Sequence, residues 1–175
     1  MKLTEAEARL FDRLYRKHAQ EVFRHCLRFA AGDRAWAKDR MQDTFLKTAL
    51  HLKKLKDPED LGGWLYRVAA RECLMALRKG RGWRQIQKRL GGKKVPANGA
   101  VGERLVQSQR DVSALEHAIS DLPAKQQAVM VLIYLDGKAQ KEAGEVLGYS
   151  KGQISKLHRR ALERLKAGEW ELIDA

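Results

Sequence analysis

The chain has 175 residues and a net charge of +13, so it is long enough for one domain or two small ones. A charge of that size points to a polyanionic partner, or else only improves solubility. The longest apolar run, residues 128–135, is too short to span a bilayer, and the polar N-terminus does not resemble a secretory signal. Helical periodicity with almost no strand pattern predicts a soluble, all-α protein.

The first helix is expected to open at a capping box made by Thr4 and Glu7 and to end at residues 31–33, Ala-Gly-Asp. His18 and His25 lie seven residues apart on one face of it. With Cys26 one residue on, they could be imagined as metal ligands, but there is no fourth ligand and no partnered motif, so core or boundary positions are favoured. Cys26 here and Cys73 further on fall on apolar stripes. They predict buried, reduced thiols in a cytoplasmic protein.

A second helix is predicted over residues 34–56 and a third over 61–79, separated by a turn at 57–60. The second buries a stripe that runs from Ala37 to Leu55. Its other faces carry Asp39, Gln42 and Asp43, which on their own indicate ordinary surface. Basic side chains gather at the end of the second helix and along the third: Lys53, Lys54, Lys56, Arg67, Arg71, Arg78 and Lys79.

The composition changes after the third helix. The next stretch is rich in glycine, and from Lys79 to Lys94 it has seven basic residues and no acidic one. That composition is typical of a flexible, cationic linker. We therefore predict two small helical domains, over residues 1–80 and 112–175, joined by a flexible basic linker over residues 81–111. Residues 1–80 carry a net +7 and the linker +6, whereas residues 112–175 are neutral.

The last third predicts helices over residues 112–120 and 121–135, followed by two short helices with a tight turn between Lys138 and Lys166. Gly148 can end the first of these in a left-handed conformation, and Ser150 with Gln153 forms a capping box for the second. The second is basic and has an apolar stripe, as in a DNA-binding helix-turn-helix. A charged helix pair that only packs on its neighbours is the alternative from this stretch alone.

No catalytic motif accompanies these helices. There is no phosphate-binding glycine loop, paired-histidine zinc motif or nucleophile elbow in the sequence. We therefore expect no enzymatic activity, no metal site and no cofactor.

Several strings together resemble a bacterial RNA polymerase sigma factor of the extracytoplasmic-function type (the group 4 sigma-70 type), which has only regions 2 and 4. In region 2 they are LYRKH from Leu14, GDRAWAKDRMQDTFLKT from Gly32 and WLYRVAAR from Trp64. In region 4 they are SALEHAISDLPAKQQAVMVL from Ser113 and GQISKLHRRALERL from Gly152. The resemblance covers nearly the whole chain apart from the linker.

The resemblance implies that region 2 binds the β′ clamp helices of core RNA polymerase through Asp39, Gln42 and Asp43. It also implies that region 2 melts the minus-ten element, with DNA contacts from Lys53, Lys54, Lys56, Arg67, Arg71, Arg78 and Lys79. Region 4 would meet the β flap and read the minus-thirty-five element through Gln153, Ser155, Lys156, Arg159 and Arg160. An anti-sigma factor is an implied partner and can hold such a protein at the membrane, with no direct membrane contact by the chain.

The sequence departs from the family pattern on the third helix, where Arg71 and Met75 stand in place of a frequent asparagine and aspartate. Ser155, Leu157 and Leu162 also replace frequent basic residues of the recognition helix. Two alternatives stay open, the first of them motivated by Arg71 and Met75. One is a helix-turn-helix regulator that uses the sigma scaffold but does not melt promoters, and the other is an enzyme that acts on nucleic acid.

Overall fold

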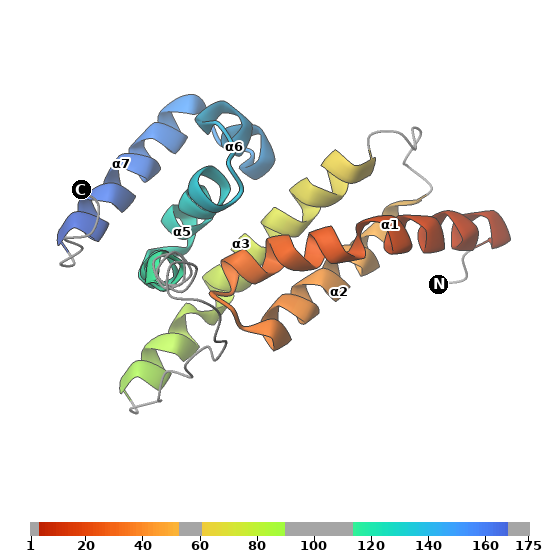
Figure 1. The fold of residues 1–175 in the computed structure, drawn as a ribbon, viewed down its shortest axis with the longest axis horizontal. Helices are drawn as coiled ribbons and strands as arrows, with labels where there is room; N and C mark the ends of the chain where they lie inside the picture. Colours follow the sequence, from red (N-terminus) through yellow and green to blue (C-terminus); the bar gives the residue numbers. More distant parts are fainter. Residues whose placement is uncertain (1–3, 53–60, 90–113, 168–175) are drawn as a thin grey trace, which may run out of the picture.

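The computed structural model describes residues 4–52, 61–89 and 114–167, with side chains given up to residue 80 in the second range. Every regular element of these ranges is a helix, as predicted (Figure 1). Residues 114–121 are helical as well. The named elements are α1 (Glu5–Phe29), α2 (Arg34–His51), α3 (Leu61–Arg89), α5 (Ala124–Met130), the π-helix η2 (Val131–Leu135), α6 (Gln140–Leu147) and α7 (Lys151–Ala167).

Helix α1 begins as its sequence predicts. The Glu7 backbone N–H donates to Thr4 Oγ1 at 3.3 Å, and the Thr4 N–H donates to Glu7 Oε2 at 2.7 Å. Its end is confirmed too, because Ala31 and Gly32 have φ angles of 47° and 87°, in the left-handed region that stops a helix. Asp33 then caps α2 by accepting from the Trp36 N–H at 3.0 Å.

Helices α1, α2 and α3 pack against one another as a three-helix unit. Phe45 of α2 meets Phe11 and Tyr15 of α1 edge-on, with ring centroids 6.1 and 4.8 Å away. Cys26 and Cys73 are fully buried in the core between α1 and α3, as predicted. Burial, then the neighbouring Cys26 thiol, raises the pKa of Cys73 well above its ordinary value, so Cys73 is a thiol rather than a reactive thiolate.

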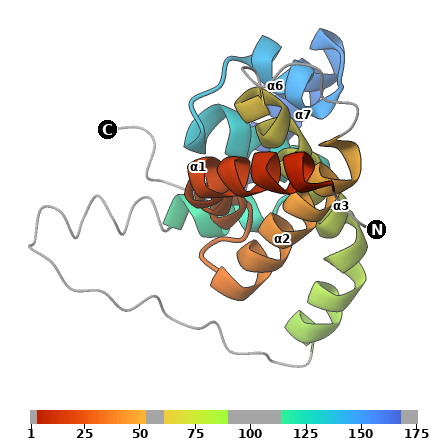
Figure 2. The same ribbon diagram turned by 90° about the vertical axis from the view of Figure 1, so that its right-hand side faces the viewer.

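Two predictions about helix ends are wrong. The third helix does not stop at Lys79 but continues to Arg89, so the expected boundary at residue 80 falls within a helix. Its end projects beyond the other helices (Figures 1 and 2). The helix expected from 121 to 135 begins only at Ala124 and changes to π geometry at Val131. Lys53, Lys54 and Lys56, and the linker from residue 90 onward, lie outside the described residues.

The helix-turn-helix formed by α6 and α7 is confirmed. Gly148 has a φ of 72° and ends α6, and Gly144 must lack a side chain because a Cβ there would lie 2.9 Å from the Tyr149 carbonyl oxygen. Ser150 Oγ accepts from the Gln153 N–H at 3.3 Å, while Gln153 Oε1 accepts from the Ser150 N–H at 2.9 Å. The α7 stripe faces inward through Ile154 and Ala161.

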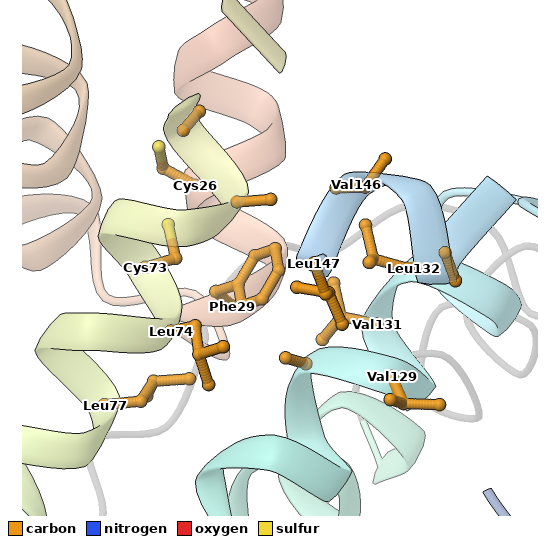
Figure 3. Packing of buried hydrophobic residues seen from close by; sticks show 14 of the residues in the cluster. Cys26, Phe29, Cys73, Leu74, Leu77, Val129, Val131, Leu132, Val146 and Leu147 are labelled. Atoms are coloured by element: carbon orange, nitrogen blue, oxygen red, sulfur yellow. The ribbon is translucent and has the colours of Figure 1, made fainter. Parts of the chain in front are cut away.

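The two halves of the chain share one apolar core. A single cluster of buried residues runs from α1 and α3 to η2, α6 and α7. In Figure 3, Phe29 of α1 lies between Leu74 of α3 and Leu147 of α6. The predicted linker connects the halves in sequence, but their apolar faces also pack directly against each other.

Candidate nucleic-acid interface

Helix α7 presents a polar, basic face. All five side chains expected to read DNA are exposed: Gln153, Ser155, Lys156, Arg159 and Arg160. The capping box fixes the start of the helix, and Gln153 is already engaged there as part of it. Arg159 Nε lies 3.7 Å from Glu163 Oε1, which is a weak, exposed pair that a phosphate could replace.

Helix α2 presents a different, mixed face. Asp39 and Gln42 are exposed, and Asp43 is half-buried with its carboxylate 3.1 Å from Arg40 Nη2. The same stripe continues through Leu46 and Leu50, whose exposed fractions are 63% and 60%. Sequence reasoning missed these two leucines. Their apolar character at i and i+4, away from the buried stripe of α2, was the available signal.

The basic side chains of α3 are not all turned to open surface. Arg67 is half-buried, whereas Arg71, Arg78 and Lys79 are exposed. The Arg71 guanidinium reaches the helix-turn-helix: its Nε donates to the Val146 carbonyl oxygen, 3.0 Å away, near the end of α6. Arg71 Nη2 also lies near Gly148, since a Cβ built on that glycine would be 3.6 Å from it. Arg71 therefore caps α6 from the other half of the chain.

A buried polar cluster centres on Asp136, which follows η2. The side chain of Asp136 is only 2% exposed. Its Oδ2 lies 2.8 Å from His25 Nδ1 and accepts from the Tyr66 hydroxyl at 2.8 Å, and its Oδ1 pairs with Arg28. Lys138 adds a cation 5.2 Å from the Tyr66 ring centroid. The prediction that His25 is a core residue is confirmed.

The surroundings decide the ionisation of this cluster. Burial raises the pKa of Asp136, but the hydrogen bond and charge of His25, with hydrogen bonds from Tyr66 and Arg28, outweigh it and leave the pKa below its ordinary value. Burial and then the Asp136 charge raise the pKa of Tyr66 far above its ordinary value, so the phenol stays a donor. Sequence reasoning treated Asp136 only as part of a helix stop. The partners come from α1 and α3, more than 60 residues away, and no local pattern pointed to them.

A third contact joins the same two parts of the chain. The Gln127 side-chain Nε2 donates to the Phe29 carbonyl oxygen at 3.0 Å, in the last turn of α1. In the described ranges, no group of three or more His, Cys, Asp or Glu side chains is placed to hold a metal ion. The arrangement therefore offers binding surfaces and an internal polar cluster.

Residues 14–84 match the family model for Sigma-70 region 2, and residues 118–167 match the model for Sigma-70, region 4. The chain belongs to the sigma-70 family. Its relatives place it among the extracytoplasmic-function sigma factors. It is 30% identical over 151 residues to the ECF RNA polymerase sigma factor SigE of Mycolicibacterium smegmatis. It is 26% identical over 160 residues to the ECF RNA polymerase sigma factor SigM of Bacillus subtilis.

The coverage of the two relatives differs. The match with SigE takes in 85% of this sigma factor but only 58% of SigE, whereas the match with SigM takes in 89% and 93% of the two chains. Solved structures agree on the fold. The sigma factor RpoE of Bartonella quintana, in complex with the anti-sigma factor NepR, superposes with a TM-score of 0.61 at 23% identity, covering 90% of this chain and 94% of RpoE.

The structure of CnrH with the cytosolic domain of CnrY superposes with a TM-score of 0.54 at 20% identity, covering 90% and 85% of the chains. None of the described helices of this sigma factor is both long enough and apolar enough to cross a membrane.

Proposed function

We propose that this sigma factor binds core RNA polymerase and directs it to specific promoters. Region 2 opens the minus-ten element, and region 4 reads the minus-thirty-five element. The observation that carries the proposal is the presence of two unlike exposed surfaces on one chain: the mixed face of α2 and the basic face of α7. The order of the two matching family models supports the same assignment.

In region 4, α7 is the recognition helix. Helix-turn-helix proteins lay the second helix in the major groove and reach base edges from its N-terminal half. Lys156, Arg159 and Arg160 are exposed there, with Gln153 and Ser155 one turn nearer the start of the helix. A good bidentate contact between such a side chain and a base discriminates by about 1–3 kcal/mol.

In region 2, the face of α2 docks on the polymerase clamp helices. Asp39, Gln42 and Asp43 supply polar contacts, and Leu46 and Leu50 supply apolar ones at the same face. Interfaces concentrate their energy in a few buried apolar or aromatic anchors ringed by polar groups. Two leucines that are mostly exposed in the free protein, directly beside the polar trio, meet that description.

The basic side chains of α3 line the path of the opened minus-ten strand. Arginine and lysine at such positions contact phosphates and hold register rather than read sequence. Arg67, Arg78 and Lys79 act in this way, and we place Lys53, Lys54 and Lys56 with them. Extruding a base costs a few kcal/mol of stacking, which these contacts help to offset.

An anti-sigma factor is the expected regulator. In one solved structure with this fold, the sigma factor RpoE is bound by the anti-sigma factor NepR, and in another CnrH is bound by the cytosolic domain of CnrY. We propose a partner of the same kind for this chain, together with a cytoplasmic location, because core polymerase and promoter DNA are there. The function is one of binding, with no chemical step of its own.

Run-off transcription tests the proposal. Core polymerase with this sigma factor is expected to initiate on a cognate promoter fragment, whereas core polymerase alone does not. Permanganate footprinting should show unpaired thymines around the minus-ten element. A protein that fails to associate with core polymerase would overturn the proposal.

A second candidate function is a sigma-like helix-turn-helix regulator that does not melt promoters. One observation favours it, because Arg71 and Met75 replace residues that the family uses near melted DNA. A regulator of that kind would bind duplex DNA tightly without polymerase and leave the thymines unreactive. A gel shift and a permanganate footprint on the same fragment separate the two functions.

A further inference from the structure

We propose that the free sigma factor is held closed by a latch between its two regions, made by the Asp136 cluster and the Arg71 cap on α6. We further infer that Arg71 is an anchor for region 4 rather than a reader of minus-ten DNA. The inference deepens the proposed function and rests on it, because the open state is the one that would act in transcription. The closed state itself is a property of the free chain.

The latch consists of side chains that reach from one region to the other. His25, Arg28 and Tyr66 lie in region 2, and Asp136 lies in region 4. A buried carboxylate is tolerated only when donors surround it, and the three donors in the described part of the chain come from the opposite region. Opening would return the Asp136 carboxylate to water, which would hydrate it in place of these donors. The cluster therefore stabilises the closed form specifically.

Arg71 makes the second contact. Its Nε donates to the Val146 carbonyl oxygen, which belongs to the last turn of α6 and has no intrahelical donor there. Arg71 itself is exposed at the rim, so this bond can break without leaving a buried charge. The same guanidinium nitrogen cannot serve a DNA phosphate while it caps α6.

The interface between the regions also has an apolar part, through Phe29, Leu74 and Leu147 (Figure 3). Packing alone would make the closed form hard to open. The Arg71 contact at the rim and the buried Asp136 cluster add a small number of polar bonds to this packing. Loss of these bonds shifts the balance from the closed form to the open form.

Fluorescence energy transfer on the free protein tests the closed state without polymerase. Cysteines introduced by Lys17→Cys on α1 and Lys166→Cys on α7, both exposed positions, would carry the dyes. The native Cys26 and Cys73 are fully buried and stay unlabelled. Arg71→Ala is expected to raise the open-to-closed ratio about 2- to 10-fold, as for one ordinary hydrogen bond lost at an exposed rim. Asp136→Asn should raise it further.

Arg16→Ala is the matched control, because Arg16 pairs with Asp12 on the exposed face of α1, away from the latch. It should leave the transfer efficiency unchanged. Circular dichroism checks that each variant is folded. If Asp136→Asn fails to fold, Arg71→Ala still decides, since that side chain is exposed.

Transcription then separates the two roles of Arg71. An anchor predicts that Arg71→Ala binds core polymerase at least as well as the wild type and keeps its run-off activity. A minus-ten reader predicts the reverse, with unchanged energy transfer and a loss of run-off product, and that result would overturn the inference. Absence of run-off from the wild type would sink the proposed function while leaving the energy-transfer result intact.

Discussion

Asp136 keeps its charge although its side chain is almost completely buried. The cost of removing a carboxylate from water is offset only because His25, Tyr66 and Arg28 converge on its two oxygens. Removing one member of such a buried arrangement typically costs several kcal/mol, since the others are left without a partner. Loss of Asp136 should therefore destabilise the closed protein, although Asp136 lies in neither of the expected binding surfaces.

Because the pKa of Asp136 is lower in the folded protein than in the unfolded chain, its contribution to stability has a definite pH window. It is fully present above the ordinary aspartate pKa of about 3.9 and is lost as the pH falls through the lowered value. Asp136→Asn should cost about 2 kcal/mol in the free energy of unfolding near pH 6. The difference from the wild type should shrink below pH 4. Urea titrations of both proteins at several pH values measure it, and a difference independent of pH would contradict the assignment.

At the scale of an element, α2 exposes two large apolar side chains beside its polar residues. Its inner stripe is buried at Ala37, Phe45 and Thr48, so these residues already serve the core. Leu46 and Leu50 add nothing to that packing and expose apolar area beside the polar trio. Apolar residues scattered singly on a surface need no explanation, but two on adjacent turns of a proposed docking face do.

The double variant Leu46→Ser, Leu50→Ser should bind core polymerase at least 10-fold more weakly, because it removes the apolar anchors of the interface. Its stability should change by less than about 1 kcal/mol, since both side chains are exposed. Competition binding to core polymerase in the absence of DNA is the measurement. Met75→Ser, another exposed apolar residue of region 2 but on α3, is the control and should bind normally. Equal affinities would remove Leu46 and Leu50 from the docking face.

The ends of helices were predicted well where the residues that form them are close together in the sequence. The capping boxes at Thr4 and Ser150 and the left-handed Gly148 define helix ends within a few residues of sequence, and all three are confirmed. The π-helix at Val131–Leu135 was not predictable in this way. Its apolar pattern suits an ordinary helix equally well, and the wider turn alters where Asp136 lies relative to the helix.

For the whole molecule, sequence periodicity shows which faces are apolar but not which of them meet. The fold class and the exposure of the five α7 residues followed from periodicity. The roles of the proposed DNA- and polymerase-binding residues stay predictions. The pairing of region 2 with region 4 depends on contacts such as Arg71 with Val146 and Asp136 with His25, far apart in the chain. For Arg71 the sequence predicts a DNA contact and gives no hint of α6, and the DNA contact stays a prediction.

A shared core has a consequence for unfolding that two independent domains would not have. Because residues of both regions belong to one apolar cluster, the regions should unfold together, in one calorimetric transition whose van't Hoff and calorimetric enthalpies agree. The double variant Arg71→Ala, Asp136→Asn weakens the polar contacts between the regions while leaving the core of each in place. It should separate the transition into two, or lower the ratio of van't Hoff to calorimetric enthalpy.

Two transitions in the wild type would show that the regions are already independent in solution, and the closed state would then have no energetic basis. One unchanged transition in the double variant would place the coupling in the apolar contacts around Phe29 rather than in the latch.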